Sequence, residues 1–155
     1  GGMMYNIPGP DVSHRDIGKA LSGGGQDAPL VVIATTSSSG KLLRELRGPG
    51  RLVLTATSPN DPQNETELPW VFTEVIASPQ TDANGDGLVS VLEIFKACHA
   101  GVKASYDKGN FMIKEHALLD GNGDGKGTAR PADADAEPAA KIGLTLPTSG
   151  SGGFD

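Results

Sequence analysis

The chain has 155 residues and a formal net charge of −6. That length is typical of one domain with a buried core, and the acidic balance argues against a nucleic-acid partner, because phosphate binding needs clustered lysine and arginine. No apolar run is long enough to span a bilayer, and the N-terminus has no charged segment followed by an apolar stretch, so we expect no membrane partner. The single cysteine, Cys98, excludes an internal disulfide and leaves the cellular compartment open.

Composition divides the chain into three segments. Residues 1–12 and 129–155 are rich in small and turn-forming residues and lack sustained apolar periodicity. We therefore expect a flexible N-terminal segment and a flexible C-terminal tail. Residues 13–128 are expected to form the compact α/β domain.

The first predicted elements of this domain form a β-α-β unit. Asp11 or Ser13 can cap a short helix that precedes the unit. The apolar, β-branched runs at 30–36 and 52–57 predict strands buried on both faces, as in a parallel sheet covered by helices. Leucines at helical spacing in 42–46 predict the helix that connects the two strands.

Further helices are predicted after the second strand. Apolar residues in 70–76 have helical spacing, and Pro79 is expected to break that helix before the next polar loop. A longer helix is predicted from Val91 to about Tyr106, and the apolar residues within 112–119 predict another.

Residues 82–93 match the EF-hand calcium loop at every position, including Gly87 at position 6, where the turn is sharp. Calcium prefers six to eight oxygen ligands, and this spacing supplies them from a short loop. The alternative is an Asx-Gly turn that binds no metal. We predict Ca²⁺ as the cofactor, with these ligands: Asp82, Asn84, Asp86, the carbonyl of Leu88, Ser90 and a bidentate Glu93.

A second, weaker candidate begins at Asp120. Position 12 of this loop is Pro131, so the bidentate carboxylate of an EF-hand is missing, and Asp133 or Asp135 could only act as a late substitute. A polar turn and a weak metal site are equally compatible with the pattern. The candidate ligands are Asp120, Asn122, Asp124, Lys126 and Thr128.

A resemblance to a known family is carried by the ends of the two predicted strands. The first ends in Thr-Thr-Ser-Ser-Ser-Gly and the second in Thr-Ala-Thr-Ser. This arrangement resembles the nucleophile region of caspase-like and legumain-like cysteine peptidases, and the run Glu-His-Ala-Leu-Leu-Asp at 115–120 resembles a segment of bacterial members of that group. The resemblance covers residues 5–128. It implies a partial caspase-like α/β domain with a parallel sheet, from which the family's His-Gly strand is absent.

The resemblance places the family's nucleophilic cysteine at Ser37, with Ser39 and Gly40 matching the rest of the motif. A serine needs a general base and an oxyanion hole to act as a nucleophile. Cys98 has an apolar helical position typical of an inert core residue. Two histidines, His99 and His116, are predicted to be exposed or structural, and the third, His14, lies in a predicted helix 23 residues before Ser37 (37 − 14). We therefore predict a peptidase-related pseudoenzyme without a Cys/His dyad.

The leading functional hypothesis is a calcium-binding, catalytically inactive domain in which calcium is mainly structural. One alternative is an EF-hand pair that acts as a calcium sensor, suggested by the 38-residue offset between the loops (120 − 82). Another is a hydrolase that uses Ser37 with a histidine supplied by another chain or an upstream segment. A sheet edge without its neighbouring strand is the expected surface for a protein partner or a homodimer.

Overall fold

The computed structural model describes residues 4–5, 12–23, 28–61 and 65–145, so most of the predicted N-terminal segment lies outside the described residues. The structure is a mixed α/β arrangement around a three-stranded sheet of order β3-β4-β6. β3 and β4 are parallel, as predicted, whereas β6 is antiparallel to β4 and makes the sheet mixed. The strands are β3 (Leu30–Ala34), β4 (Arg51–Thr55) and β6 (Leu118–Asp120).

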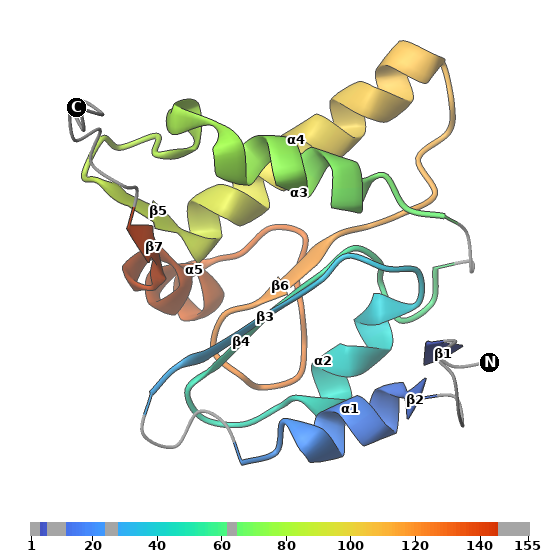
Figure 1. Ribbon diagram of the computed structural model, residues 1–155, viewed down its shortest axis with the longest axis vertical. Helices are drawn as coiled ribbons and strands as arrows, with labels where there is room; N and C mark the ends of the chain where they lie inside the picture. Colours follow the sequence, from blue (N-terminus) through green and yellow to red (C-terminus); the bar gives the residue numbers. More distant parts are fainter. Residues whose placement is uncertain (1–3, 6–11, 24–27, 62–64, 146–155) are drawn as a thin grey trace, which may run out of the picture.

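Helices cover both faces of this sheet (Figure 1). Leu52 and Leu54 of β4 belong to the larger core cluster, with residues of the helices on one face. Val53 points to the opposite face and packs in a second cluster with Leu42 and Leu46. β4 is therefore buried on both faces, as its continuous apolar sequence predicts. The helices are α1 (His14–Ala20) and α2 (Leu42–Glu45) on one side, α3 (Leu68–Ala77) and α4 (Val91–Gly109) on the other.

Local signals explain several of these boundaries. Ser13 caps α1 through a capping box, in which its Oγ accepts from the N–H of Asp16 at 3.3 Å and the Asp16 carboxylate accepts from the N–H of Ser13 at 3.1 Å. α2 follows a short 3-10 helix, η1 (Ser39–Lys41). α3 and α4 pack closely because Gly101 leaves room for Val71, whose Cγ1 would lie 2.5 Å from an added Cβ.

The helix predicted within 112–119 is wrong. Asn110, in the left-handed conformation with φ 53°, ends α4. The following segment has no regular secondary structure until β6 begins at Leu118. Burial alternates along it: Glu115, Ala117 and Leu119 are buried, whereas the residues at 114 and 116 are exposed. This period of two is typical of a strand, and the cluster of apolar residues concealed it.

The C-terminal part of the compact structure also differs from the prediction. Residues 133–145, which we expected in a flexible tail, form helix α5 (Asp133–Lys141) and strand β7 (Gly143–Thr145). β7 pairs antiparallel with β5 (Leu88–Ser90), and Ala139 of α5 is fully buried in the larger core cluster. Residues 146–155 of the predicted tail lie outside the described residues. A further pair, β1 (Met4–Tyr5) with β2 (Val12–Ser13), is antiparallel.

Within the described ranges, no helix combines the length and the apolar character that crossing a membrane requires.

Candidate metal centre

The loop at 82–93 lies between α3 and α4. α3 ends at Ala77 and is followed by the 3-10 helix η2 (Pro79–Thr81), so the irregular entrance predicted from Pro79 is confirmed. The Thr81 hydroxyl donates to the Val75 carbonyl at 2.6 Å and ties this turn back to α3. Gly85 and Gly87 adopt φ values of 72° and 85°, which a residue with a Cβ rarely adopts.

The carboxylate of Asp82 organises the first half of the loop. Its Oδ1 accepts from the N–H of Gly85 at 2.8 Å and of Asp86 at 3.2 Å, and its Oδ2 accepts from the N–H of Gly87 at 2.9 Å. Asn84 Oδ1 accepts from the N–H of Asp86 at 2.8 Å, and Asp86 Oδ1 accepts from the N–H of Leu88 at 2.8 Å. The side chains at loop positions 1, 3 and 5 thus curl inward over the backbone.

Glu93 closes the loop from the first turn of α4. Its Oε1 accepts from the N–H of Ala83 at 3.0 Å and of Asn84 at 3.3 Å, and its Oε2 accepts from the N–H and the hydroxyl of Ser90 at 2.9 and 2.7 Å. Desolvation alone would raise the pKa of Glu93, but the hydrogen bonds from Ser90, Asn84 and Ala83 outweigh it and lower the pKa. One carboxylate therefore joins both ends of the loop in its ionised form.

The donor set of this loop is compatible with a hard cation, because all its candidate ligands are oxygens.

The direction of the Leu88 carbonyl follows from the pairing of β5 with β7. Val91 N–H donates to the Ile142 carbonyl beside β7. Backbone groups alternate along a strand, so the carbonyl of Leu88 faces away from β7. In the described part of the chain, no three carboxylate, imidazole or thiolate side chains gather in a metal-binding arrangement. The loop carboxylates instead accept hydrogen bonds from the backbone.

The loop that begins at Asp120 repeats this arrangement. Asp120 Oδ1 accepts from the N–H of Gly123 and its Oδ2 from the N–H of Gly125, both at 2.7 Å. Asn122 Oδ1 accepts from the N–H of Asp124 at 2.9 Å, and Asp124 Oδ1 accepts from the N–H of Lys126 at 2.7 Å. The two loops therefore share one hydrogen-bond pattern from position 1 to position 7.

The second loop departs from the first after that point. Thr128 pairs with Leu119 through two backbone hydrogen bonds of 3.0 Å. The carboxylate of Asp135, from α5, accepts from the N–H of Gly121 at 3.0 Å. Gly121 is at position 2 of its loop. In the first loop, the residue at position 2 is Ala83, and its N–H donates to Glu93. Of the two late carboxylates considered from the sequence, Asp135 is thus at the mouth of the second loop.

Asp120 is fully buried, unlike Asp82. Burial raises the pKa of the Asp120 carboxyl, the N–H groups of Gly125 and Gly123 oppose this shift, and the negative charges of Asp124 and Asp135 add to it. The second loop therefore concentrates negative charge around a carboxylate that water hardly reaches.

The Ser37 region lies at the C-terminal end of β3. Ser37 is half-buried and precedes Ser38, which adopts φ 58°. Ser39 Oγ accepts from the N–H of Ala56 at 3.0 Å and of Thr57 at 3.3 Å, so this hydroxyl connects η1 to the residues that follow β4. No hydrogen bond joins Ser37 to an imidazole in the described part of the chain. Gly40 lies against the same backbone, where an added Cβ would meet the Thr57 carbonyl oxygen at 2.4 Å.

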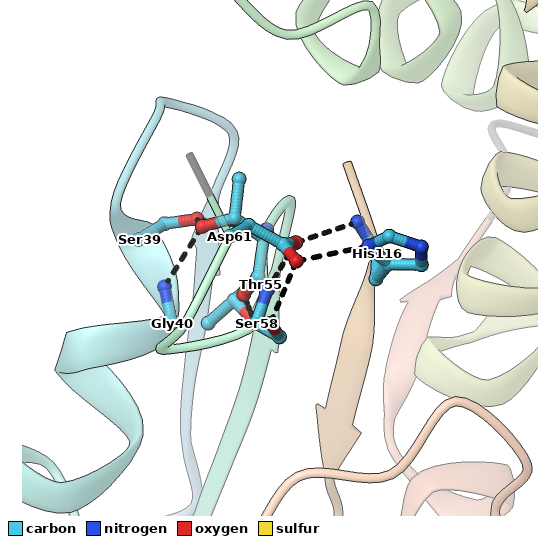
Figure 2. A network of polar contacts seen from close by, with 7 residues as sticks. Ser39, Gly40, Thr55, Ser58, Asp61 and His116 are labelled. Atoms are coloured by element: carbon cyan, nitrogen blue, oxygen red, sulfur yellow. Dashed lines mark hydrogen bonds and ion pairs between the residues drawn. The ribbon is translucent and has the colours of Figure 1, made fainter. Parts of the chain in front are cut away.

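Beside it, Figure 2 shows a pair formed by Asp61 and His116, with Nδ1 and Oδ1 2.9 Å apart. Asp61 also accepts from the N–H of Ser58 at 2.8 Å and of His116 at 2.9 Å. The separation of 55 positions between the two residues hides this contact in the sequence. The side chain of His116 is 58% exposed, as predicted, but it lies on the segment before β6 and not on a helix.

The cysteine and the two remaining histidines lie on helices α4 and α1. Burial raises the pKa of the Cys98 thiol to about 12, and the side chain is fully buried in the core. His99 is exposed on α4, and His14 is the first residue of α1. Glu115, which sequence patterns did not identify, is buried with its Oε1 accepting from the N–H of Glu67 at 2.8 Å, at the start of α3. Desolvation raises the pKa of Glu115, although the N–H groups of Glu67 and Leu68 oppose it.

Neither a family model nor a curated protein nor a solved structure matches this chain. The fold and the loops by themselves define a mixed α/β domain with two loops of similar hydrogen-bond pattern, one on each side of α4.

Proposed function

We propose that this protein is a calcium-binding domain in which the ion is structural. We also propose that Ser37, at the position of the peptidase nucleophile, is catalytically inactive. The observation that carries the proposal is the hydrogen-bond arrangement of the loop at 82–93. Asp82 holds the turn, Glu93 bridges its two ends, and every candidate ligand is an oxygen. Calcium would replace weak backbone contacts of these carboxylates with stronger charge interactions.

The residues proposed to hold calcium are those predicted from the spacing: Asp82, Asn84, Asp86, the Leu88 carbonyl, Ser90 and Glu93. The second loop is proposed as a weaker site formed by Asp120, Asn122, Asp124 and the Lys126 carbonyl, with Asp135 in place of the missing position-12 residue. The shared hydrogen-bond pattern of the two loops supports this extension.

Isothermal titration with calcium chloride tests the proposal. We expect saturable binding to the native chain, and Glu93→Gln should weaken it by at least about tenfold, or about 1.4 kcal/mol, because the loop loses its closing charge. Glu137→Gln is the matched control, since Glu137 is exposed on α5 and pairs with Lys141 at 2.6 Å outside both loops. Asp124→Asn separates the contribution of the second loop.

Absence of a calcium signal, or unchanged binding by Glu93→Gln, would refute the first site. Loss of binding in Asp124→Asn with normal binding in Glu93→Gln would assign the metal to the second loop.

The calcium-sensor alternative has less support. In an EF-hand pair, helices flank each loop and the two loops pair with each other. Here β5 of the first loop pairs with β7, and a parallel β3–β4 pair precedes both loops.

The catalytically silent part of the proposal rests on Ser37 and its surroundings. A serine nucleophile needs a base within hydrogen-bond reach, and in the described residues no imidazole is hydrogen-bonded to Ser37. We propose a relationship to caspase-like and legumain-like peptidases on the motifs at 35–40 and 115–120 only. Peptide hydrolysis that disappears in Ser37→Ala would contradict the silent assignment.

A further inference from the structure

Among the described strands, β3 lies at the edge of its sheet, and none of them pairs with its outer side. The N–H of Leu30 donates to the Gly50 carbonyl at 2.8 Å, and the Ala34 carbonyl accepts from the N–H of Ala56 at 2.9 Å. Leu30 and Ala34 therefore direct their backbone groups toward β4. Residues of a strand alternate in this respect, so Val31 and Ile33 direct their N–H and C=O groups outward, where no described strand pairs with them.

Between Pro29, which precedes the strand, and Thr35, which follows it, the outer edge of β3 has no feature that normally protects an edge. It contains no charged residue, no proline and no bulge, only the apolar run Leu-Val-Val-Ile-Ala. The free part is short, because the next outward carbonyl, that of Thr35, accepts from the Thr66 hydroxyl at 2.7 Å. The edge thus offers the backbone groups of two residues, Val31 and Ile33.

An apolar hollow of about 230 Å³ lies beside β3, on the face of the sheet that carries the side chains of Val31 and Ile33. The hollow is formed by β3, the start of α4 and the chain entering β7. Leu144, on its rim, is 57% exposed. The residues that line it are Val31, Ile33, Val91, Ile94, Ile142, Gly143 and Leu144.

We propose that two copies of this chain pair through β3, antiparallel and edge to edge, around a two-fold axis at Val32. In this register Val31 faces Ile33 of the second copy, and Ile33 faces its Val31. Both residues present a donor and an acceptor outward, so the edge is complementary to itself and forms four hydrogen bonds. An isologous contact of this kind closes the assembly as a dimer.

The side chains near the β3 edge also favour a second copy of this chain as its partner. A two-fold axis perpendicular to the sheet keeps the same face of both sheets on one side, so the two apolar hollows become continuous. Leu144 then lies at the joined groove instead of facing solvent. The β3 edge carries no charge, so the net charge of −6 on each chain is not concentrated at the contact.

Light scattering coupled to size exclusion, over a range of protein concentrations, tests the dimer. We expect twice the mass of one chain at high concentration. Val31→Pro should shift the protein to the monomer, since it removes an outward N–H that makes no hydrogen bond within the sheet. Trp70→Ala is the control, because Trp70 is 72% exposed on α3 and offers a competing apolar surface.

Hydrogen exchange of the Val31 and Ile33 amides provides a readout that does not depend on the variant folding. In the dimer these amides should become protected as concentration rises. A native chain that stays monomeric, or a dimer that survives in folded Val31→Pro, would overturn the proposal. So would a dimer lost in Trp70→Ala, or edge amides protected at every concentration, which would indicate a different covering strand.

Discussion

Asp61 is the residue on which the polar contacts at the C-terminal end of the sheet converge. Its two carboxylate oxygens receive four hydrogen bonds, two from Ser58 and two from His116. Desolvation would raise the pKa of Asp61, but these hydrogen bonds outweigh it and lower the pKa below its ordinary value of 3.8. The ionised carboxylate therefore joins the loop after β4 to the segment before β6.

The lowered pKa predicts a pH-dependent contribution to stability. The folded-state pKa lies below the unfolded one, so the stabilisation is complete above about pH 4 and is lost as pH falls through the folded-state pKa. Asp61→Asn should reduce the free energy of unfolding by about 1–3 kcal/mol at pH 7, and the difference from the native chain should shrink below about pH 4. Urea unfolding across this pH range measures it.

Asp107→Asn on the exposed surface of α4 is the control and should change stability little, because exposed ion pairs contribute little. A destabilisation by Asp61→Asn that is equal at pH 7 and pH 3 would contradict the role assigned to the charge.

α5 and β7 together connect the two loops. β7 lies along β5 of the first loop, and α5 brings Asp135 to the N–H of Gly121 in the second. Close backbone approach makes this possible at Gly143, where an added Cβ would lie 2.1 Å from the Val89 carbonyl oxygen. The C-terminal segment is therefore part of the structure around the candidate metal centre.

Gly143→Ala should separate β7 from β5. Since the obstructing atoms are backbone, we expect a loss of about 1–3 kcal/mol in the free energy of unfolding. Hydrogen exchange within residues 143–145 should also become faster. Gly23→Ala is the matched control, because an added Cβ there meets no atom within 4 Å. Equal stability and exchange in the two variants would show that the β5–β7 pairing contributes little.

For the whole molecule, the proposed calcium site connects the helical layer above the sheet to the C-terminal segment. The loop joins η2 to α4, β5 pairs with β7, and α4 provides core residues such as Phe95 and Cys98. An ion bound to the native loop alone would therefore stabilise the whole cooperative unit.

Calcium should raise the thermal unfolding temperature. A calcium concentration of one hundred times Kd adds about 2.7 kcal/mol to the free energy of unfolding. A chelator should reverse the shift, and Glu93→Gln should abolish it. Thermal melts followed by circular dichroism, with Glu137→Gln as the control, measure the effect. A native chain whose melt is the same in calcium and in chelator would argue against a structural ion.

Local patterns in the sequence were sufficient for part of the fold. The cap at Ser13, which was one of two candidates, the break at Pro79 and the doubly buried strand β4 depend on neighbouring residues or on periodicity, and all three are confirmed. The buried state of Cys98 follows from the same kind of pattern. The oxygen ligands at 82–93 were likewise readable as a calcium motif, and calcium binding stays a prediction.

Contacts between distant residues were decided only by the tertiary structure. The antiparallel place of β6, the docking of β7 on β5, the Asp61–His116 pair and the position of Asp135 all join segments whose local sequence does not specify a partner. The segment after α4 shows the reason most clearly. Its apolar residues suit a helix or a strand, and pairing with β4 settles which of the two forms, because only the strand satisfies the backbone groups of both partners.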